Sequence, residues 1–301
     1  MTTPVERPAS PKAPVAFRVA IAQVAPCLGN VAANLQMHLD NIAKAREAGA
    51  DLVVFPELSL TGYYLRDQVP EVAEPVDGPS LRAILDSAGS MSVVCGFVEE
   101  GHGHRFYNAA AFSEAGSIVR VHRKVYLPTY GMFDEQRYFA AGNRVCAFDT
   151  RFGRVGLLIC EDAWHLDCGV ILQADGIDVL IIVANSPGRG VREATLGSQQ
   201  TWDHVTQTFA MFLNVPVIFA NRVGYEDGVC FWGGSQVVGP SGTPLADAGV
   251  LEPALVTADI DPRETRLQRI LTPLGRDQRL HLIIDEQERI RHESYGRGTR
   301  L

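Results

Sequence analysis

Apolar runs of strand length alternate with stretches of helical periodicity along this 301-residue chain. Residues 17–26 form an apolar run that predicts a strand. Residues 30–50 repeat apolar side chains near helical spacing, with Asn30 placed to cap the helix and Gly49 placed to end it. A short buried strand is predicted over residues 51–57. The chain therefore begins with two parallel strands joined by a helix in a right-handed crossover.

The later apolar runs predict more strands and two further helices. Three runs joined by glycine turns, over residues 91–100, 105–114 and 116–125, are typical of antiparallel neighbours. The other predicted elements are, in chain order, strands over 144–150 and 153–160, a helix over 163–176, a strand over 178–187, a helix over 192–214, a strand over 216–224, and strands within 231–242 and 254–260. This order favours an α/β fold, in which sheets are flanked by helices, over two independent domains.

Composition and charge exclude several classes of function. The formal net charge is −8 and 46% of the residues are hydrophobic, so we expect a large core and no nucleic-acid partner. No apolar stretch reaches 18 residues, which argues against a membrane span. Residues 1–16 are rich in proline and polar side chains and lack the apolar core of a signal peptide, so they are predicted to be a disordered lead.

The cysteines and histidines do not form a recognisable metal or disulfide pattern. The six cysteines are scattered and contain no C-x-x-C pair, which favours reduced thiols in a cytoplasmic protein. His102 and His104 are spaced to chelate a metal, but a hairpin turn is the favoured interpretation. We expect no metal, nucleotide or flavin cofactor.

The last 39 residues differ in character from the rest of the chain. Residues 263–301 are highly charged around one apolar patch at 280–284. Such a segment is either loose or docked on a partner subunit. We therefore separate a C-terminal extension, 263–301, from a main domain over 17–262.

Several predicted buried strands end in residues that can carry chemistry. These residues are Glu57, Lys124, Cys160, Asn185 and Ser186. In α/β sheets, sites gather outside the carboxyl ends of strands, so a carboxylate, an ammonium and a thiol could converge there. Each also has an ordinary role as a helix cap, a surface charge or a small core residue. The separations in sequence do not join them without a fold.

Three segments that contain these residues resemble signature motifs of one family. "FPELSLTGY" holds Glu57, "HRKVYLP" holds Lys124, and "GLLICEDAW" holds Cys160. Together they resemble the nitrilase, or carbon–nitrogen hydrolase, superfamily. The resemblance implies a four-layer α-β-β-α sandwich that carries a Glu-Lys-Cys triad.

A fourth segment, "LPTYGMFDEQRYFAAG", extends the resemblance. It implies an additional acid, which by position is Glu135. The motifs are most similar to those of the glutamine-hydrolysing domain of glutamine-dependent NAD synthetases, and we expect a stand-alone member of this type.

The chemistry of amide hydrolysis explains why these groups would work together. A thiolate attacks an amide carbon better than water does, and Glu57 can accept the thiol proton if burial raises its pKa. Lys124 would favour the thiolate and stabilise the oxyanion, with the backbone N–H of Glu161 as second donor. Glu135 would hold Lys124 or the leaving ammonia. The side chains of Glu161 and Asp162 are interpreted as first-turn acids that favour a helix N-terminus.

Other residues are candidates for binding the substrate, although each also has an ordinary interpretation as packing or as a solvated loop. Arg189 or Arg192 would pair with a substrate carboxylate. The predicted substrate-binding residues are Tyr63, Tyr130, Trp164, Ser186 and Arg189, and Phe133 lies on the same expected loop.

The function predicted from these residues is hydrolysis of a small carboxamide to an acid and ammonia through a thioester. A glutamine-like amide or ω-amide is the first expectation. An N-carbamoyl amine and a nitrile remain open, because the same triad serves them. Two different alternatives are a non-catalytic metabolite-binding protein and a subunit that donates ammonia to a separate synthetase. Family resemblance also implies a homodimer or a larger homo-oligomer.

Overall fold

The computed structural model describes residues 14–192 and 195–295. The predicted disordered lead falls mostly on residues 1–13, which lie outside the described residues. The last six residues of the predicted extension, 296–301, lie outside them as well. Within the described part of the chain, no helix combines the length and apolar character needed to cross a membrane.

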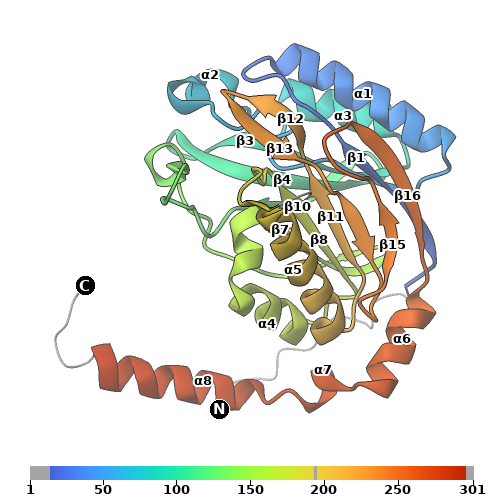
Figure 1. Ribbon diagram of the computed structural model, residues 1–301, viewed down its shortest axis with the longest axis vertical. Helices are drawn as coiled ribbons and strands as arrows, with labels where there is room; N and C mark the ends of the chain where they lie inside the picture. The colour runs from blue at the N-terminus through green and yellow to red at the C-terminus, as the bar shows by residue number, and fades with distance from the viewer. Residues whose placement is uncertain (1–13, 193–194, 296–301) are drawn as a thin grey trace.

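Two six-stranded sheets form the centre of the molecule (Figure 1). The first sheet contains, in spatial order, β16 (Ala254–Ile260), β1 (Phe17–Gln23), β2 (Leu52–Val54), β3 (Ser92–Gly101), β4 (Arg105–Glu114) and β5 (Ser117–Arg123). The second contains β15 (Pro244–Asp247), β14 (Gln236–Val238), β11 (Val217–Asn221), β8 (Val179–Ala184), β7 (Gly153–Ile159) and β6 (Phe148–Thr150).

Helices cover the outer face of each sheet, which gives four layers (Figure 1). On β1, Val19 and Ile21 belong to the core between the sheets, whereas Ala20 and Ala22 pack with Ile42 of a covering helix. This period-two alternation is what a strand between two apolar layers requires. The helices are α1 (Val31–Glu47) and α3 (Pro79–Ala88) on the first sheet, and α4 (Leu166–Ala174) and α5 (Gly197–Leu213) on the second. The predicted α-β-β-α sandwich is confirmed.

Strand pairing also follows the prediction. β1 and β2 are parallel and joined by α1, whose N-terminus is capped by the side chain of Asn30. β3, β4 and β5 are successive antiparallel neighbours. β7, β8 and β11 are parallel, so their carboxyl ends lie at one edge of the second sheet.

The predictions for two helices need correction. The helix expected over 192–214 begins only at Gly197, because Leu196 is extended and two short strands, β9 (Val191–Arg192) and β10 (Thr195–Leu196), pair before it. The helix expected over 163–176 is divided at His165, whose extended backbone separates the 3₁₀ helix η3 (Cys160–Trp164) from α4. The elements not predicted individually are α3, η1 (Arg66–Gln68), α2 (Val69–Val72), η2 (Glu135–Arg137), β12 (Val223–Glu226), β13 (Val229–Trp232) and β15.

The C-terminal extension is helical rather than irregular. Its elements are α6 (Pro262–Leu271), α7 (Leu274–Asp277), α8 (Leu280–Ile290) and a π-helical turn, Arg291–Tyr295. In Figure 1, α8 stands away from both sheets. It leaves Leu280, Ile284 and Ile290 exposed.

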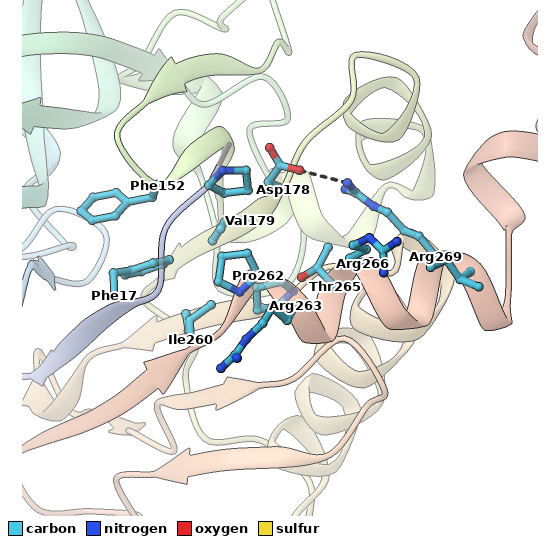
Figure 2. Close-up of a pocket in the computed structure, with 13 residues that line it drawn as sticks. Phe17, Phe152, Asp178, Val179, Ile260, Pro262, Arg263, Thr265, Arg266 and Arg269 are labelled. Carbon is cyan, nitrogen blue, oxygen red and sulfur yellow. Dashed lines mark hydrogen bonds and ion pairs between the residues drawn. The ribbon is translucent and has the colours of Figure 1, made fainter. Parts of the chain in front are cut away.

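A cavity of about 530 Å³ lies between the start of β1, the end of β16 and α6 (Figure 2). Phe17, Val179 and Ile260 line it, and on its rim Arg269 forms an ion pair of 3.0 Å with Asp178. Phe17 and Val179 are the first residues of their strands. The cavity is therefore at the opposite end of the strands from the predicted reactive residues.

Candidate active site

Glu57 begins a tight turn three residues after the end of β2 and is only 1% exposed. The next residue, Leu58, has a φ of +44°, a left-handed conformation that is costly for a residue with a Cβ. The turn rests against the backbone of β3 at Gly96, where an added Cβ would lie 2.3 Å from Leu58 N. Glycine at position 96 thus permits the close approach that fixes Glu57.

The carboxylate of Glu57 accepts three hydrogen bonds from three separate segments of the chain. Lys124 Nζ and Asn108 Nδ2 each donate to Oε1 at 2.7 Å, and the backbone N–H of Asn185 donates to Oε2 at 2.7 Å. Asn108 and Lys124 come from the first sheet, whereas Asn185 follows β8 of the second. Glu57 therefore connects the two sheets at the site.

Lys124, directly after β5, lies between two acids. Its Nζ donates to Glu57 Oε1 at 2.7 Å and to Glu135 Oε1 at 2.6 Å. Burial alone would lower the pKa of Lys124, but the charges of Glu135 and Glu57 outweigh burial and hold the pKa well above its ordinary value. Burial raises the pKa of Glu135 to about 7 against the opposing charge of Lys124.

Tyr63 extends this buried network on the side of Glu135. Its hydroxyl donates to Glu135 Oε1 at 2.6 Å. The backbone N–H groups of Tyr63 and Tyr64 donate to Glu226 Oε1 at 2.9 and 2.7 Å. Glu226 in turn pairs with the buried Arg222 at 2.6 Å. The position of Tyr63 is thus fixed by a second buried ion pair.

Cys160 follows the last residue of β7 and begins η3. Its φ of +46° is a second left-handed conformation at the site. Burial, with a contribution from Glu57, raises the pKa of the Cys160 thiol well above its ordinary value, while Lys124 acts in the opposite direction. The charges of Glu57, Lys124 and Glu135 therefore all act on this sulfur.

A cavity of about 480 Å³ opens over Cys160. Its lining includes four of the five residues predicted to bind substrate, namely Tyr130, Trp164, Ser186 and Arg189, together with Phe133 and Glu161. Tyr63 is not part of this lining and instead borders a neighbouring cavity together with Glu135. The side chain of Arg192 lies outside the described residues.

Opposite charges face this cavity. The hydroxyl of Tyr130 donates to Glu161 Oε2 at 2.9 Å. The guanidinium of Arg189 lies over the ring of Phe133, 4.5 Å from its centroid. Glu161 was interpreted from the sequence as a first-turn acid. Its position adds a carboxylate to the cavity wall that already carries the Arg189 guanidinium.

Comparison with known proteins assigns the family. A family model for carbon-nitrogen hydrolases matches residues 18–270. The chain belongs to the carbon–nitrogen hydrolase family. The match includes the segments that carry Glu57, Lys124 and Cys160.

Individual relatives of this carbon–nitrogen hydrolase include synthetases and amidases. It is 30% identical over 257 residues to a glutamine-dependent NAD(+) synthetase from Acinetobacter baylyi, covering 84% of this chain and 46% of the relative. It is 33% identical over 240 residues to an (R)-stereoselective amidase from a Pseudomonas species, covering 77% and 81%. The chain thus spans under half the length of the synthetases that it matches.

Solved structures agree with this grouping. A glutamine-dependent NAD+ synthetase from Acinetobacter baumannii superposes with a TM-score of 0.74 at 29% identity, covering 83% of this chain and 46% of that one. An amidase from Nesterenkonia sp. superposes with a TM-score of 0.75 at 25% identity, covering 89% and 95%.

Two tryptophans of this carbon–nitrogen hydrolase were not singled out from the sequence. Trp202 Nε1 donates to Ser186 Oγ at 2.8 Å, and Trp232 Nε1 approaches the same oxygen at 3.3 Å. Since an indole N–H can only donate, these contacts occupy the acceptor side of the hydroxyl. Ser186 is left with its own O–H as a donor.

Asn108 was also missed, although the sequence contains a signal for it. It lies in the middle of the otherwise apolar strand β4, is 1% exposed, and donates to Glu57. A polar side chain inside a buried strand must find a partner. That expectation alone would have marked Asn108 as part of a polar site.

Proposed function

We propose that this chain hydrolyses the side-chain amide of a glutamine-like substrate, giving the acid and ammonia through a thioester on Cys160. The supporting observation is that Glu161 and Arg189 both line the cavity over the thiol. A carboxylate complements a substrate amine and a guanidinium complements a substrate carboxylate. Glutamine carries both groups at the end remote from its amide.

The proposed reaction begins with proton transfer from the thiol to Glu57. This transfer is required because the pKa of Cys160 is raised by burial. The sulfur then bonds to the amide carbon, and Lys124 with the backbone N–H of Glu161 stabilises the oxyanion. Glu57 returns the proton to the nitrogen as the C–N bond breaks and ammonia leaves.

The second half of the proposed reaction hydrolyses the thioester. A water molecule gives a proton to Glu57 and attacks the acyl carbon. The C–S bond breaks, the thiol regains its proton, and the acid is released. Ser186, with an O–H left to donate, is suited to bind an oxygen atom of the substrate.

A panel of substrates tests the proposal through ammonia release. The panel contains glutamine, glutaramate, which lacks the amine, and 4-aminobutanamide, which lacks the carboxylate. An N-carbamoyl amine and a nitrile complete it. Glutamine should have the highest kcat/KM. Preference for the N-carbamoyl amine or the nitrile would refute the assignment and favour those reactions of the same triad.

Variants connect the substrate to the proposed roles. Glu161→Gln should reduce the preference for glutamine over glutaramate, and Arg189→Gln should reduce the preference over 4-aminobutanamide. Cys160→Ala should fold and show no turnover. Cys168→Ala is the matched control, because Cys168 is a buried thiol on α4 whose pKa is raised by burial to about 12. Turnover by Cys160→Ala would contradict the mechanism.

The likeness to NAD synthetases supports a second proposal, in which a separate synthetase chain consumes the ammonia. Under this proposal the rate of glutamine hydrolysis rises when the partner synthetase and its other substrates are added. A rate that is independent of the partner would leave simple hydrolysis as the function.

We also propose that the chain forms a homo-oligomer through α4, α5 and the C-terminal extension. Large apolar side chains are exposed on α4 and α5, for example Ile171 and Phe212, and α8 stands away from the sheets with its own apolar residues uncovered. Light scattering should show at least a dimer. Phe212→Glu should lower the mass, whereas Tyr225→Glu, an exposed aromatic on β12, should leave it unchanged.

A further inference from the structure

Asp162 lies two residues after Cys160 and is fully buried. Its carboxylate has four N–H partners. Oδ1 accepts from the backbone N–H groups of Val125 and Tyr126, both at 2.9 Å. Oδ2 accepts from the backbone N–H of Ile159 at 3.1 Å and from His122 Nε2 at 2.8 Å. The acceptor capacity of this one side chain is fully used.

These donors belong to the two segments that carry the ammonium and the sulfur. His122 lies two residues before Lys124 on β5, and Val125 and Tyr126 follow Lys124 directly. Ile159 is the last residue of β7 and precedes Cys160. Asp162 therefore forms hydrogen bonds to the chain on both sides of Lys124 and to the residue that precedes Cys160.

This arrangement exceeds what a helix-terminal acid requires. An acid in the first turn needs only the helix dipole and nearby N–H groups, yet three of the four donors to Asp162 come from β5 and the segment that directly follows it. Cys160 is also held at a φ of +46°. A left-handed residue of this kind costs about 1–2 kcal/mol and persists only where the surroundings enforce it.

We propose that Asp162, paired with His122, is a positioning residue that sets the place of the Lys124 ammonium relative to the Cys160 sulfur. The inference deepens the proposed hydrolysis and rests on it for its effect on turnover. Lys124 lowers the pKa of the thiol and would stabilise the oxyanion. A displaced Lys124 would weaken both effects, whereas the cavity that binds the substrate does not include Asp162.

Asp162→Asn is the sharpest variant because it keeps the size of the side chain. Whichever way the amide is turned, one pair of donors faces an N–H₂ group that cannot accept. We expect kcat to fall about 10²-fold, the loss that a displacement of about 1 Å in an active site can produce, with KM near the wild-type value. Asp167→Asn, an exposed acid in the first turn of α4, should match the wild type in both constants.

A second measurement requires no substrate. The rate at which iodoacetamide alkylates Cys160, in the wall of its cavity, is followed against pH. The Cys160 peptide is quantified by mass spectrometry because the exposed Cys27 will react as well. Asp162→Asn should move the alkylation midpoint to higher pH, since the ammonium that lowers the thiol pKa is displaced. A purely structural role would lower the melting temperature and leave this midpoint and the kcat of the folded protein unchanged.

His122→Phe provides an independent variant in case Asp162→Asn does not fold. It keeps an aromatic ring at this position and the three backbone contacts of Asp162, so the same shifts should appear with smaller size. Unchanged kcat and an unchanged alkylation midpoint in the folded variants would overturn the proposal. If the alkylation midpoint shifts in Asp162→Asn but the wild-type protein hydrolyses none of the amides, Asp162 would still be a positioning residue. The proposed function would then be rejected.

Discussion

The hydroxyl of Tyr63 donates a hydrogen bond of 2.6 Å to Glu135 Oε1. Burial raises the pKa of Glu135 to about 7, and the bond from Tyr63 opposes that rise. Tyr63→Phe should therefore raise the pKa of Glu135 further. If the ionised form of Glu135 supports turnover, the acidic limb of the kcat profile should move to higher pH.

The control for this prediction is Tyr138→Phe. Tyr138 borders the same neighbouring cavity as Tyr63, but the hydroxyl that donates to Glu135 is that of Tyr63. Its acidic limb should coincide with that of the wild type. An unmoved limb in Tyr63→Phe would show that Glu135 does not govern the profile.

Glu135→Gln should change how stability depends on pH. The folded pKa of about 7 is raised from the ordinary 4.5, so the stabilising contribution of Glu135 is complete below about pH 4.5 and is lost as pH rises through 7. Glutamine does not titrate. Relative to the wild type, the unfolding free energy of Glu135→Gln should therefore increase across this window by up to about 3 kcal/mol. Urea unfolding at several pH values measures this, and a constant difference would contradict it.

Gly96→Ala should lower the stability of the fold and displace Glu57, the proposed general base. The added Cβ would lie 2.3 Å from Leu58 N and 2.6 Å from Pro56 O, so the backbone around Glu57 must move. We expect a destabilisation of about 1–3 kcal/mol or more and a lower kcat. Gly275→Ala is the matched control, because a Cβ added there would lie an ordinary 3.8 Å from its nearest neighbour, a Gln173 side-chain atom. Equal behaviour of the two variants would contradict this explanation.

Trp202→Phe should affect substrate binding through Ser186. The variant keeps an aromatic ring to stack on Phe219, whose ring centroid is 4.6 Å away, but loses the N–H that orients the Ser186 hydroxyl. KM should rise several-fold, as expected for the loss of a hydrogen bond worth about 1 kcal/mol.

A double-mutant cycle tests whether Trp202 acts through Ser186. Ser186→Ala should raise KM, and adding Trp202→Phe to it should cause little further change, because the two residues share one interaction. Additive effects would indicate that Trp202 acts through packing alone.

The reactive residues could be anticipated from the sequence because their signals are local. Glu57, Lys124 and Cys160 each end an apolar run, and the carboxyl ends of parallel strands are where α/β sheets build sites. The pattern of apolar runs predicted strands in sheets flanked by helices, and the family resemblance added the sandwich of two sheets. The resemblance of the local motifs to the family then implied that these three residues form one triad and that Glu135 is an additional acid.

The contacts between those residues could not be anticipated because they depend on how two sheets pack. Nothing near Asp162 in the sequence indicates that its partners are Val125 and Tyr126, 37 and 36 residues away. The helix predicted over residues 192–214 contains Trp202, but nothing in the sequence indicates the hydrogen bond from its indole N–H to Ser186. The prediction also extended this helix too far, over residues 192–196, because the sequence pattern gives no sign that the backbone of Leu196 is extended.

Because the reactive groups come from two sheets, the geometry needed for catalysis depends on how those sheets pack together. Glu57 and Lys124 follow strands of one sheet and Cys160 follows a strand of the other. A partly loosened molecule could keep all its strands and helices, and so its far-ultraviolet circular dichroism, while the sulfur separates from its base. During gentle denaturation, catalysis should therefore disappear before secondary structure does. The rate of hydrolysis would then report on the packing between the two sheets.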